Sequence, residues 1–143
     1  MKSLRDDLEN DYFRDLTSEI EAELTADYMG QAERLLIEGT AGQFDHVPAA
    51  VLAGAVLEKT LKSICENLNP PEPIVTDKGA PLKLNVLIDT LKKRKVYNEL
   101  MAKQLRAWAA IRNSAAHGNF EEFNRSQVEL MLSGINSFLG QYI

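Results

Sequence analysis

The sequence predicts an all-α protein, an antiparallel bundle of four main helices with a further helix before them. Apolar residues recur at spacings of three and four in five successive segments, which is the period of a helix. No segment alternates apolar and polar residues as a half-buried strand does. Proline and glycine gather between the five segments, where they end helices.

The composition places the chain among globular proteins. Its 143 residues are enough for one domain with its own core. The single cysteine, Cys65, excludes an intrachain disulfide and favours a reducing compartment, so we expect a cytoplasmic protein. The acidic N-terminus has no apolar signal region, and no apolar stretch is long enough to span a membrane. Histidine and cysteine are too few for a zinc site, and we expect no metal and no cofactor.

Net charge limits the nucleic-acid functions that the chain can have. The formal net charge is −5, whereas proteins that wrap nucleic acid non-specifically carry a basic excess. Any contact with RNA must therefore be brief and depend on a local group of cations.

The first half of the chain contains an extension and two predicted helices. Residues 1–16 mix charges and aromatic residues and are expected to form an extension or a loose helix, before a domain over 17–143. A helix is expected over 17–38, with Thr17 or Ser18 as its cap. Its predicted apolar face consists of Ile20, Leu24, Tyr28, Ala32 and Leu35.

The second predicted helix follows Asp45, which is expected to cap it, and ends at the sequence NPPEP over 69–73. Pro48 is compatible with a first turn. The apolar stripe is broad, which indicates a central helix that contacts two neighbours. A run of small residues would let another helix approach closely. The small residues are Ala49, Ala50, Ala53, Gly54 and Ala55, and the apolar stripe consists of Val51, Leu52, Ala55, Val56, Leu61, Ile64, Cys65 and Leu68.

Three more helices are predicted, over 83–96, 98–118 and 126–143. Ser126 is expected to cap the last of these helices, with Glu129 three residues later in a capping box. The predicted inward residues are Leu84, Leu87, Ile88 and Leu91 in the third helix, Leu100, Gln104, Trp108, Ile111 and Ala115 in the fourth, and Val128, Met131, Leu132, Ile135, Phe138 and Leu139 in the fifth.

The fourth helix ends in a group of polar residues beside its apolar stripe. Asn113 and His117 are four residues apart, so they share a face and the amide is expected to hydrogen-bond the imidazole. Arg112 lies about 140° from His117 around the helix axis and carries a planar guanidinium suited to phosphate. Gly118 is expected to end the helix in a left-handed conformation.

These three side chains suit the cleavage of a phosphodiester. Attack by the ribose 2′-hydroxyl needs a base at that hydroxyl and an acid at the leaving oxygen, but this group offers only one histidine. A two-fold homodimer would supply the second. The alternative interpretation is structural, because a histidine at a helix end is usually a cap or a surface residue, and an arginine on a helix usually forms an ion pair.

The sequence RNSAAH over 112–117 matches the R-x4-H motif of HEPN domains, which places a polar residue directly after the arginine. Four further features resemble the family: an alanine-rich helix with the acidic residue Glu58, a variable loop, the helix over 83–96, and an amphipathic helix after the motif. The resemblance covers residues 17–143. It is strongest with a prokaryotic, defence-associated branch whose domain has no assigned function.

The resemblance implies a four- to five-helix bundle that dimerises. It also implies a metal-independent endoribonuclease of a toxin–antitoxin or antiviral defence system, acting on RNA in a cleft between two copies. Arg112 would contact phosphate, Asn113 would position it, and His117 would act on the 2′-hydroxyl or the leaving group. Glu58 matches an acidic position that faces the motif in many members. The implied partners are RNA, a second copy, and an antitoxin, a nucleotidyltransferase or another defence protein.

Two other functions remain open at this stage. One is a non-catalytic module for dimerisation or partner binding, and the other is a nucleotide-sensing accessory domain in which Arg112 binds a phosphorylated ligand. A second group of cations, Lys92, Lys93, Arg94 and Lys95, predicts an RNA-binding patch, or complements the helix dipole instead. Cys65 and Trp108 are expected to be core residues, and GTAGQ over 39–43 a linker.

Overall fold

The computed structural model describes residues 22–39, 42 and 44–142 of the chain. The predicted extension over 1–16 and the cap at Thr17 or Ser18 lie outside these residues. The described part is helical and contains no strand, only an isolated bridge between Val75 and Pro81, which confirms the all-α prediction. A helix over 22–38 comes first. It is followed by α2 (Val47–Asn67), α3 (Leu84–Lys93), α4 (Glu99–Ala116), the short 3-10 helix η1 (Phe120–Glu122) and α5 (Arg125–Tyr142).

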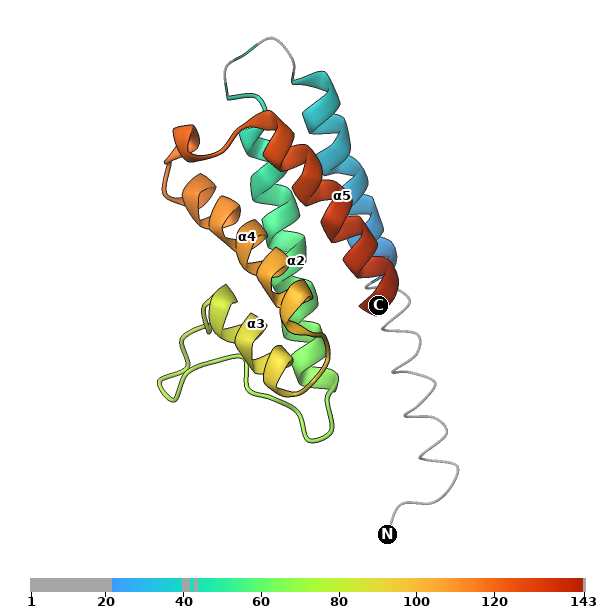
Figure 1. The fold of residues 1–143 in the computed structure, drawn as a ribbon, viewed down its shortest axis with the longest axis vertical. Helices are drawn as coiled ribbons and strands as arrows, with labels where there is room; N and C mark the ends of the chain where they lie inside the picture. Colours follow the sequence, from blue (N-terminus) through green and yellow to red (C-terminus); the bar gives the residue numbers. More distant parts are fainter. Residues whose placement is uncertain (1–21, 40–41, 43, 143) are drawn as a thin grey trace.

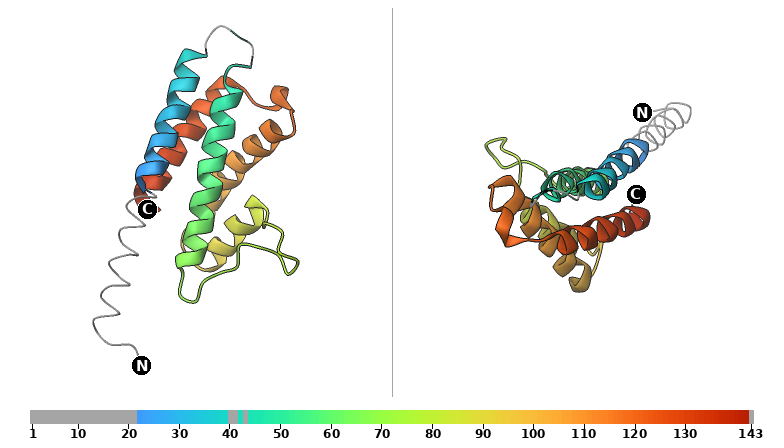
Figure 2. Two further views of the ribbon diagram at one scale, coloured as in Figure 1. Left: turned by 180° about the vertical axis from the view of Figure 1, so that it is seen from behind. Right: turned by 90° about the horizontal axis from the view of Figure 1, so that it is seen from above.

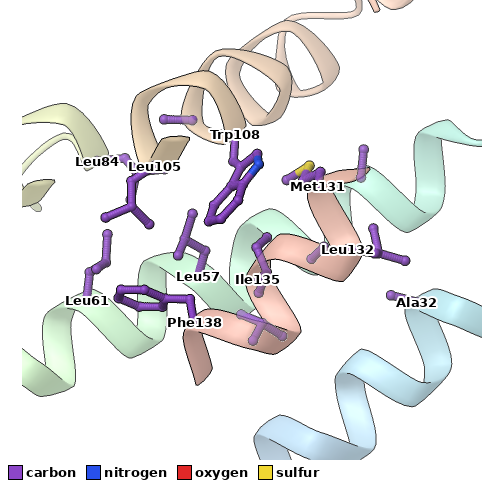
Figure 3. Close-up of a cluster of buried hydrophobic side chains, with 14 of the residues drawn as sticks. Ala32, Leu57, Leu61, Leu84, Leu105, Trp108, Met131, Leu132, Ile135 and Phe138 are labelled. Carbon is purple, nitrogen blue, oxygen red and sulfur yellow. The ribbon is translucent and has the colours of Figure 1, made fainter. Parts of the chain in front are cut away.

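Helix α2 is the centre of the bundle. It packs against α3, α4 and α5, whereas the breadth of its apolar stripe indicated two neighbours. The helix over 22–38 lies beside α2 and α5, while α3 covers the lower part of α2 and α4 (Figures 1 and 2). Figure 3 shows the core between α2, α4 and α5, where Leu57, Trp108 and Phe138 approach one another. These side chains are at most 8% exposed, so burial of apolar area stabilises the bundle.

The predicted inward faces of α3 and α5 are confirmed. All four residues predicted for α3 are buried, and so are those predicted for α5, except for the half-buried Leu139. Trp108 and Cys65 are buried as expected. A Cβ on Gly134 of α5 would overlap the Trp108 ring, so this glycine lets α5 pack directly on the indole.

The predicted face of the first helix is wrong at three positions and correct at Ala32, and the predicted Ile20 lies outside the described residues. Leu24, Tyr28 and Leu35 are exposed by 40–43%. A one-residue offset turns the face by about 100°, and the sequence has two adjacent apolar stripes there, so periodicity alone did not select between them. The buried residues are Thr25, Met29, Ala32 and Leu36.

The predicted face of α4 is also partly wrong. Leu100 is 71% exposed and Gln104 is exposed, whereas Trp108 and Ala115 are buried as predicted. Three of the five buried residues of α4 are alanines, which a search for large apolar side chains does not single out. The other buried residues of α4 are Ala102, Leu105 and Ala109.

Asp45 does not cap α2. The N-cap residue is His46, whose side chain makes no capping hydrogen bond, and the Asp45 carboxylate accepts from the Gly42 backbone N–H instead. Pro48 lies in the first turn as predicted, where its missing N–H leaves no helical hydrogen bond unmade.

The cap of α5 is Asn124, and the prediction of Ser126 is wrong. The Asn124 side chain accepts from the Gln127 N–H at 2.9 Å, and the Gln127 side chain accepts from the Asn124 N–H at 2.9 Å. This is the reciprocal arrangement of a capping box. Because either spacing fits the pattern, the sequence did not decide between the two pairs.

Asn124→Ala is expected to lower the free energy of unfolding by about 1 kcal/mol, because the Gln127 N–H in the first turn loses its side-chain acceptor. Ser126→Ala, an exposed change two residues away, is expected to stay within about 0.5 kcal/mol of the wild type. Urea denaturation of the two variants measures the difference. If Asn124→Ala lowers the free energy of unfolding no more than Ser126→Ala does, the capping pair of Asn124 and Gln127 does not stabilise the fold.

A network of ion pairs joins α3 to the start of α4. Arg106 donates to Asp89 at 2.9 Å and to Glu99 at 2.9 Å, and Lys92 also pairs with Glu99. The hydrogen bonds from Lys92 and Arg106 lower the pKa of Glu99 to about 2. The carboxylate therefore favours the folded state above its ordinary pKa, and this contribution is lost as pH falls toward 2.

Glu99→Gln is expected to lower the melting temperature at neutral pH and to have a smaller effect near pH 2, where the wild type has lost the same contribution. Glu121→Gln, an exposed carboxylate, serves as the control and is expected to leave the pH profile of the melting temperature unchanged. Thermal unfolding followed across this pH range tests the prediction. A wild-type profile identical to that of Glu99→Gln would contradict it.

Candidate functional site

Arg112 points from the C-terminal half of α4 toward α2. Its Nη2 donates to the Oε2 of Glu58 at 2.8 Å, across 54 positions of sequence. The two side chains are 33% and 21% exposed, so the pair lies at the edge of the α2–α4 contact and remains open to solvent on one side. The structure therefore brings together Arg112 and the acidic residue that the family resemblance singled out.

Gly54 has no side chain, and this leaves the space on α2 that the Arg112 side chain occupies. A Cβ at this position would overlap the Cγ of Arg112 and lie 2.8 Å from its Cβ. These atoms are at the backbone end of the side chain, so they cannot swing away. The predicted close approach of a helix to the small residues of α2 is thus observed, and at Gly54 the approaching group is Arg112.

Glu58 lies between two cations. Its other oxygen, Oε1, is 3.5 Å from the Nζ of Lys62, one turn further along α2. The sequence analysis missed Lys62, although the spacing of four from Glu58 is the usual signal for such a pair. Glu58, Lys62 and Arg112 together carry a formal charge of +1, so the cluster attracts anions despite its carboxylate.

His117 is exposed at the end of α4. It is the C-cap residue, with φ −92° and ψ 4°, and Gly118 follows with φ +77°, in the left-handed conformation that was predicted. Within the described residues the imidazole has no hydrogen-bond partner. The expected side-chain bond from the half-buried Asn113 is not formed, although the backbone N–H of His117 still donates to the Asn113 carbonyl at 3.0 Å.

An acidic hollow of about 420 Å³ adjoins the end of α4. It is lined by Phe44, Gly118 and η1, including Glu121 and Glu122. The Ser114 hydroxyl donates to Glu122 at 2.6 Å, which holds η1 against α4. These carboxylates would repel phosphate, so an RNA backbone is expected to approach His117 from another side.

The predicted basic patch over 92–95 lies at the other end of α4. Lys92 pairs with Glu99, the first residue of that helix, whereas His117 follows its last residue. An α-helix of 18 residues is about 27 Å long. Arg94 donates to the Pro70 carbonyl at 2.8 Å and to Glu72 at 2.9 Å. The structure thus does not bring the patch to the motif, and it gives two of the four cations internal partners.

Other candidate groups carry no chemistry in this structure. Cys65 is fully buried, and burial raises the pKa of its thiol, so it behaves as an apolar core residue. His46 is 7% exposed and packs edge-on against Phe123, with 5.5 Å between the ring centroids. Among the described residues no group of three histidine, cysteine or acidic side chains is placed to hold a metal ion. In the same residues, no helix combines the length and the apolar character that a membrane span requires.

Comparison with known proteins adds no relative: no protein-family model matches the chain, and no match was found among the curated proteins or the solved structures. Inferences about function therefore depend on the residues themselves.

Proposed function

We propose that the chain is a metal-independent endoribonuclease of the HEPN type, with one site built from two copies. The observation that carries the proposal is the placement of Arg112 and His117. A half-buried guanidinium is held by Glu58 through a single nitrogen, and an exposed imidazole without a partner in the described residues ends the same helix. The guanidinium has five N–H donors, so most of them remain available to a phosphate.

In the proposed reaction, His117 of one copy takes the proton of a ribose 2′-hydroxyl. The hydroxyl oxygen then attacks the adjacent phosphorus, and the bond from phosphorus to the 5′-oxygen of the next nucleotide breaks. His117 of the second copy donates a proton to that oxygen. The products are a 2′,3′-cyclic phosphate and a 5′-hydroxyl. Arg112 stabilises the negative charge that develops on the non-bridging oxygens.

Glu58 and Asn113 act as positioning residues in this proposal. Glu58 restrains the guanidinium, and its own position is supported by Lys62. Asn113 lies half-buried beside Arg112 and supplies an amide near the phosphate. Neither residue exchanges a proton with the substrate.

The test is an RNA cleavage assay in the presence of a chelator. Pure protein is incubated with a single-stranded RNA, and the ends of the products are analysed. We expect cleavage that leaves 2′,3′-cyclic phosphates and that stops when the 2′-hydroxyls are replaced by 2′-O-methyl groups. Absence of cleavage by the dimer on mixed RNA, or cleavage that requires a divalent metal, would contradict the proposal.

A non-catalytic module for partner binding is the second candidate. It is favoured by the acidic hollow beside His117, by the net charge of −5 and by the Arg112–Glu58 pair, which gives the arginine a structural partner. Under this alternative the cleavage assay is negative and His117→Ala has no effect on RNA. The partner would then be a second copy, an antitoxin, a nucleotidyltransferase or another defence protein. A nucleotide-sensing domain would instead retain a phosphorylated ligand that depends on Arg112.

A further inference from the structure

A small groove lies between the helix over 22–38 and α2, above the buried residues Thr25 and Val56. Its volume is about 190 Å³, and its walls include Leu24 and Tyr28 from the first helix and Leu52, Ala55 and Lys59 from α2. The two helices run side by side in both views from the side (Figures 1 and 2). The groove is apolar along its walls and has a cation, Lys59, in its lining.

Tyr28 presents an aromatic ring to this groove. It is 41% exposed, and within the described residues it contacts no other aromatic ring and its hydroxyl has no hydrogen-bond partner. It lies about 100° around the helix from the buried stripe and so contributes little to the core. An exposed aromatic side chain in an apolar groove is the usual platform on which a base of single-stranded nucleic acid stacks.

Cationic side chains lie between this groove and the proposed active site. Lys59 lines the groove, Lys62 lies three residues further along α2, and Lys62 shares Glu58 with Arg112. Residues three and four apart are neighbours on a helix surface, about 5–6 Å between their Cβ atoms. Lys62 and Arg112 thus both pair with Glu58, and Lys59 lies one turn before Lys62 on α2.

We propose that this groove binds a nucleobase of single-stranded RNA, with Tyr28 as the stacking platform and Lys59 and Lys62 contacting the neighbouring phosphates. The inference rests on the proposed function, which places the scissile phosphate at Arg112. The charge of this surface favours an RNA strand over a protein partner as the ligand of the groove. Apolar walls that lead into three cations match the alternating bases and phosphates of an RNA strand, whereas a protein partner would need carboxylates at the same spacing.

The test measures binding separately from cleavage. A fluorescent single-stranded RNA of mixed sequence with 2′-O-methyl riboses is titrated with the full chain, and anisotropy gives the dissociation constant. Tyr28→Ala is expected to weaken binding about tenfold, and Tyr28→Phe to retain it, because stacking needs the ring and not the hydroxyl. Ile37→Ala is the matched control, since Ile37 is 70% exposed on the opposite side of the same helix.

Salt dependence tests the cationic part. With Lys59, Lys62 and Arg112 on phosphates, the logarithm of the binding constant should fall with the logarithm of salt concentration with a slope of about −2. Lys62→Gln should make the slope less steep by about 0.7, whereas Lys93→Gln, at the other end of α4, should leave it unchanged. Equal slopes for wild type and Lys62→Gln would overturn the assignment of the phosphate contacts.

The outcomes separate this inference from the proposed nuclease. Active cleavage with unchanged binding by Tyr28→Ala would overturn the groove alone. No cleavage of unmodified RNA, with binding that still depends on Tyr28 and Lys62, would overturn the nuclease and retain an RNA-binding surface. A Tyr28→Ala chain that binds RNA normally but dissociates into monomers in sedimentation would show that a second copy occupies the groove, which also overturns the inference.

Discussion

His117→Ala is expected to reduce the rate of RNA cleavage by about 10²- to 10⁴-fold, the range typical of losing a general acid or base. In a dimeric site the change removes both proton-transferring groups at once. The imidazole is exposed and has no hydrogen-bond partner within the described residues, so the melting temperature should not change. Single-turnover cleavage of a short RNA, with circular dichroism on the same sample, measures both quantities.

Asn119→Ala provides the matched control for this variant. Asn119 is exposed two residues after His117 and is outside the proposed machinery, so the rate should stay within about twofold of the wild type. If His117→Ala retains the rate of Asn119→Ala, the imidazole has no part in the reaction and the partner-binding alternative is favoured.

Gly54→Ala is expected to destabilise the fold and to abolish cleavage together. The added methyl would overlap Cγ of Arg112, so α2 and α4 must separate or the arginine must leave Glu58. Overpacking of this kind costs about 1–3 kcal/mol, against a gain of up to about 1 kcal/mol in helix propensity. Urea denaturation should therefore give a net loss of about 1–2 kcal/mol, with no detectable RNA cleavage.

Gly30→Ala shows what the same substitution does without a neighbour. Gly30 lies inside the helix over 22–38, and a Cβ there would have nothing within 4 Å. The variant should gain about 0.5–1 kcal/mol of stability. If Gly54→Ala is stabilised by a similar amount, the packing of Arg112 against Gly54 is not tight and the positioning argument fails.

Sequence reasoning succeeded where one apolar stripe was unambiguous. In α3 and α5 the residues at threes and fours are the buried ones, because the rest of each helix surface is mainly polar. The small residues of α2 predicted a close helix contact, and Gly54 provides it. Gly118 predicted the end of α4 because a left-handed residue there favours glycine.

Sequence reasoning failed where two local arrangements fitted the same sequence pattern. The first helix has two apolar stripes about 100° apart, and only the position of α2 and α5 selects the one through Met29. Asn124 and Ser126 both satisfy capping spacings, and the chain uses Asn124. The Asn113–His117 side-chain bond was predicted from helical spacing, but a shared face only makes the two residues neighbours, and the structure joins them through the backbone alone.

Some residues of the candidate site were predicted from the sequence, and others were missed. Glu58 and Arg112 lie 54 positions apart, and only the resemblance to a family indicated that they face each other, since spacing within a helix carries no information about contacts between helices. Lys62 was missed because a lysine on a helix is unremarkable until its neighbours in space are known. Tyr28 was missed because its spacing assigned it to the inward face of the first helix, whereas it is 41% exposed.

The sharing of one site by two copies is tested most directly by mixing chains. Wild-type and His117→Ala protein are unfolded together, refolded at varied ratios and assayed for RNA cleavage. If each site needs an imidazole from both copies, only wild-type pairs are active and the activity falls with the square of the wild-type fraction, to about a quarter at equal amounts. Activity that falls in direct proportion, to about half at equal amounts, would contradict the shared site.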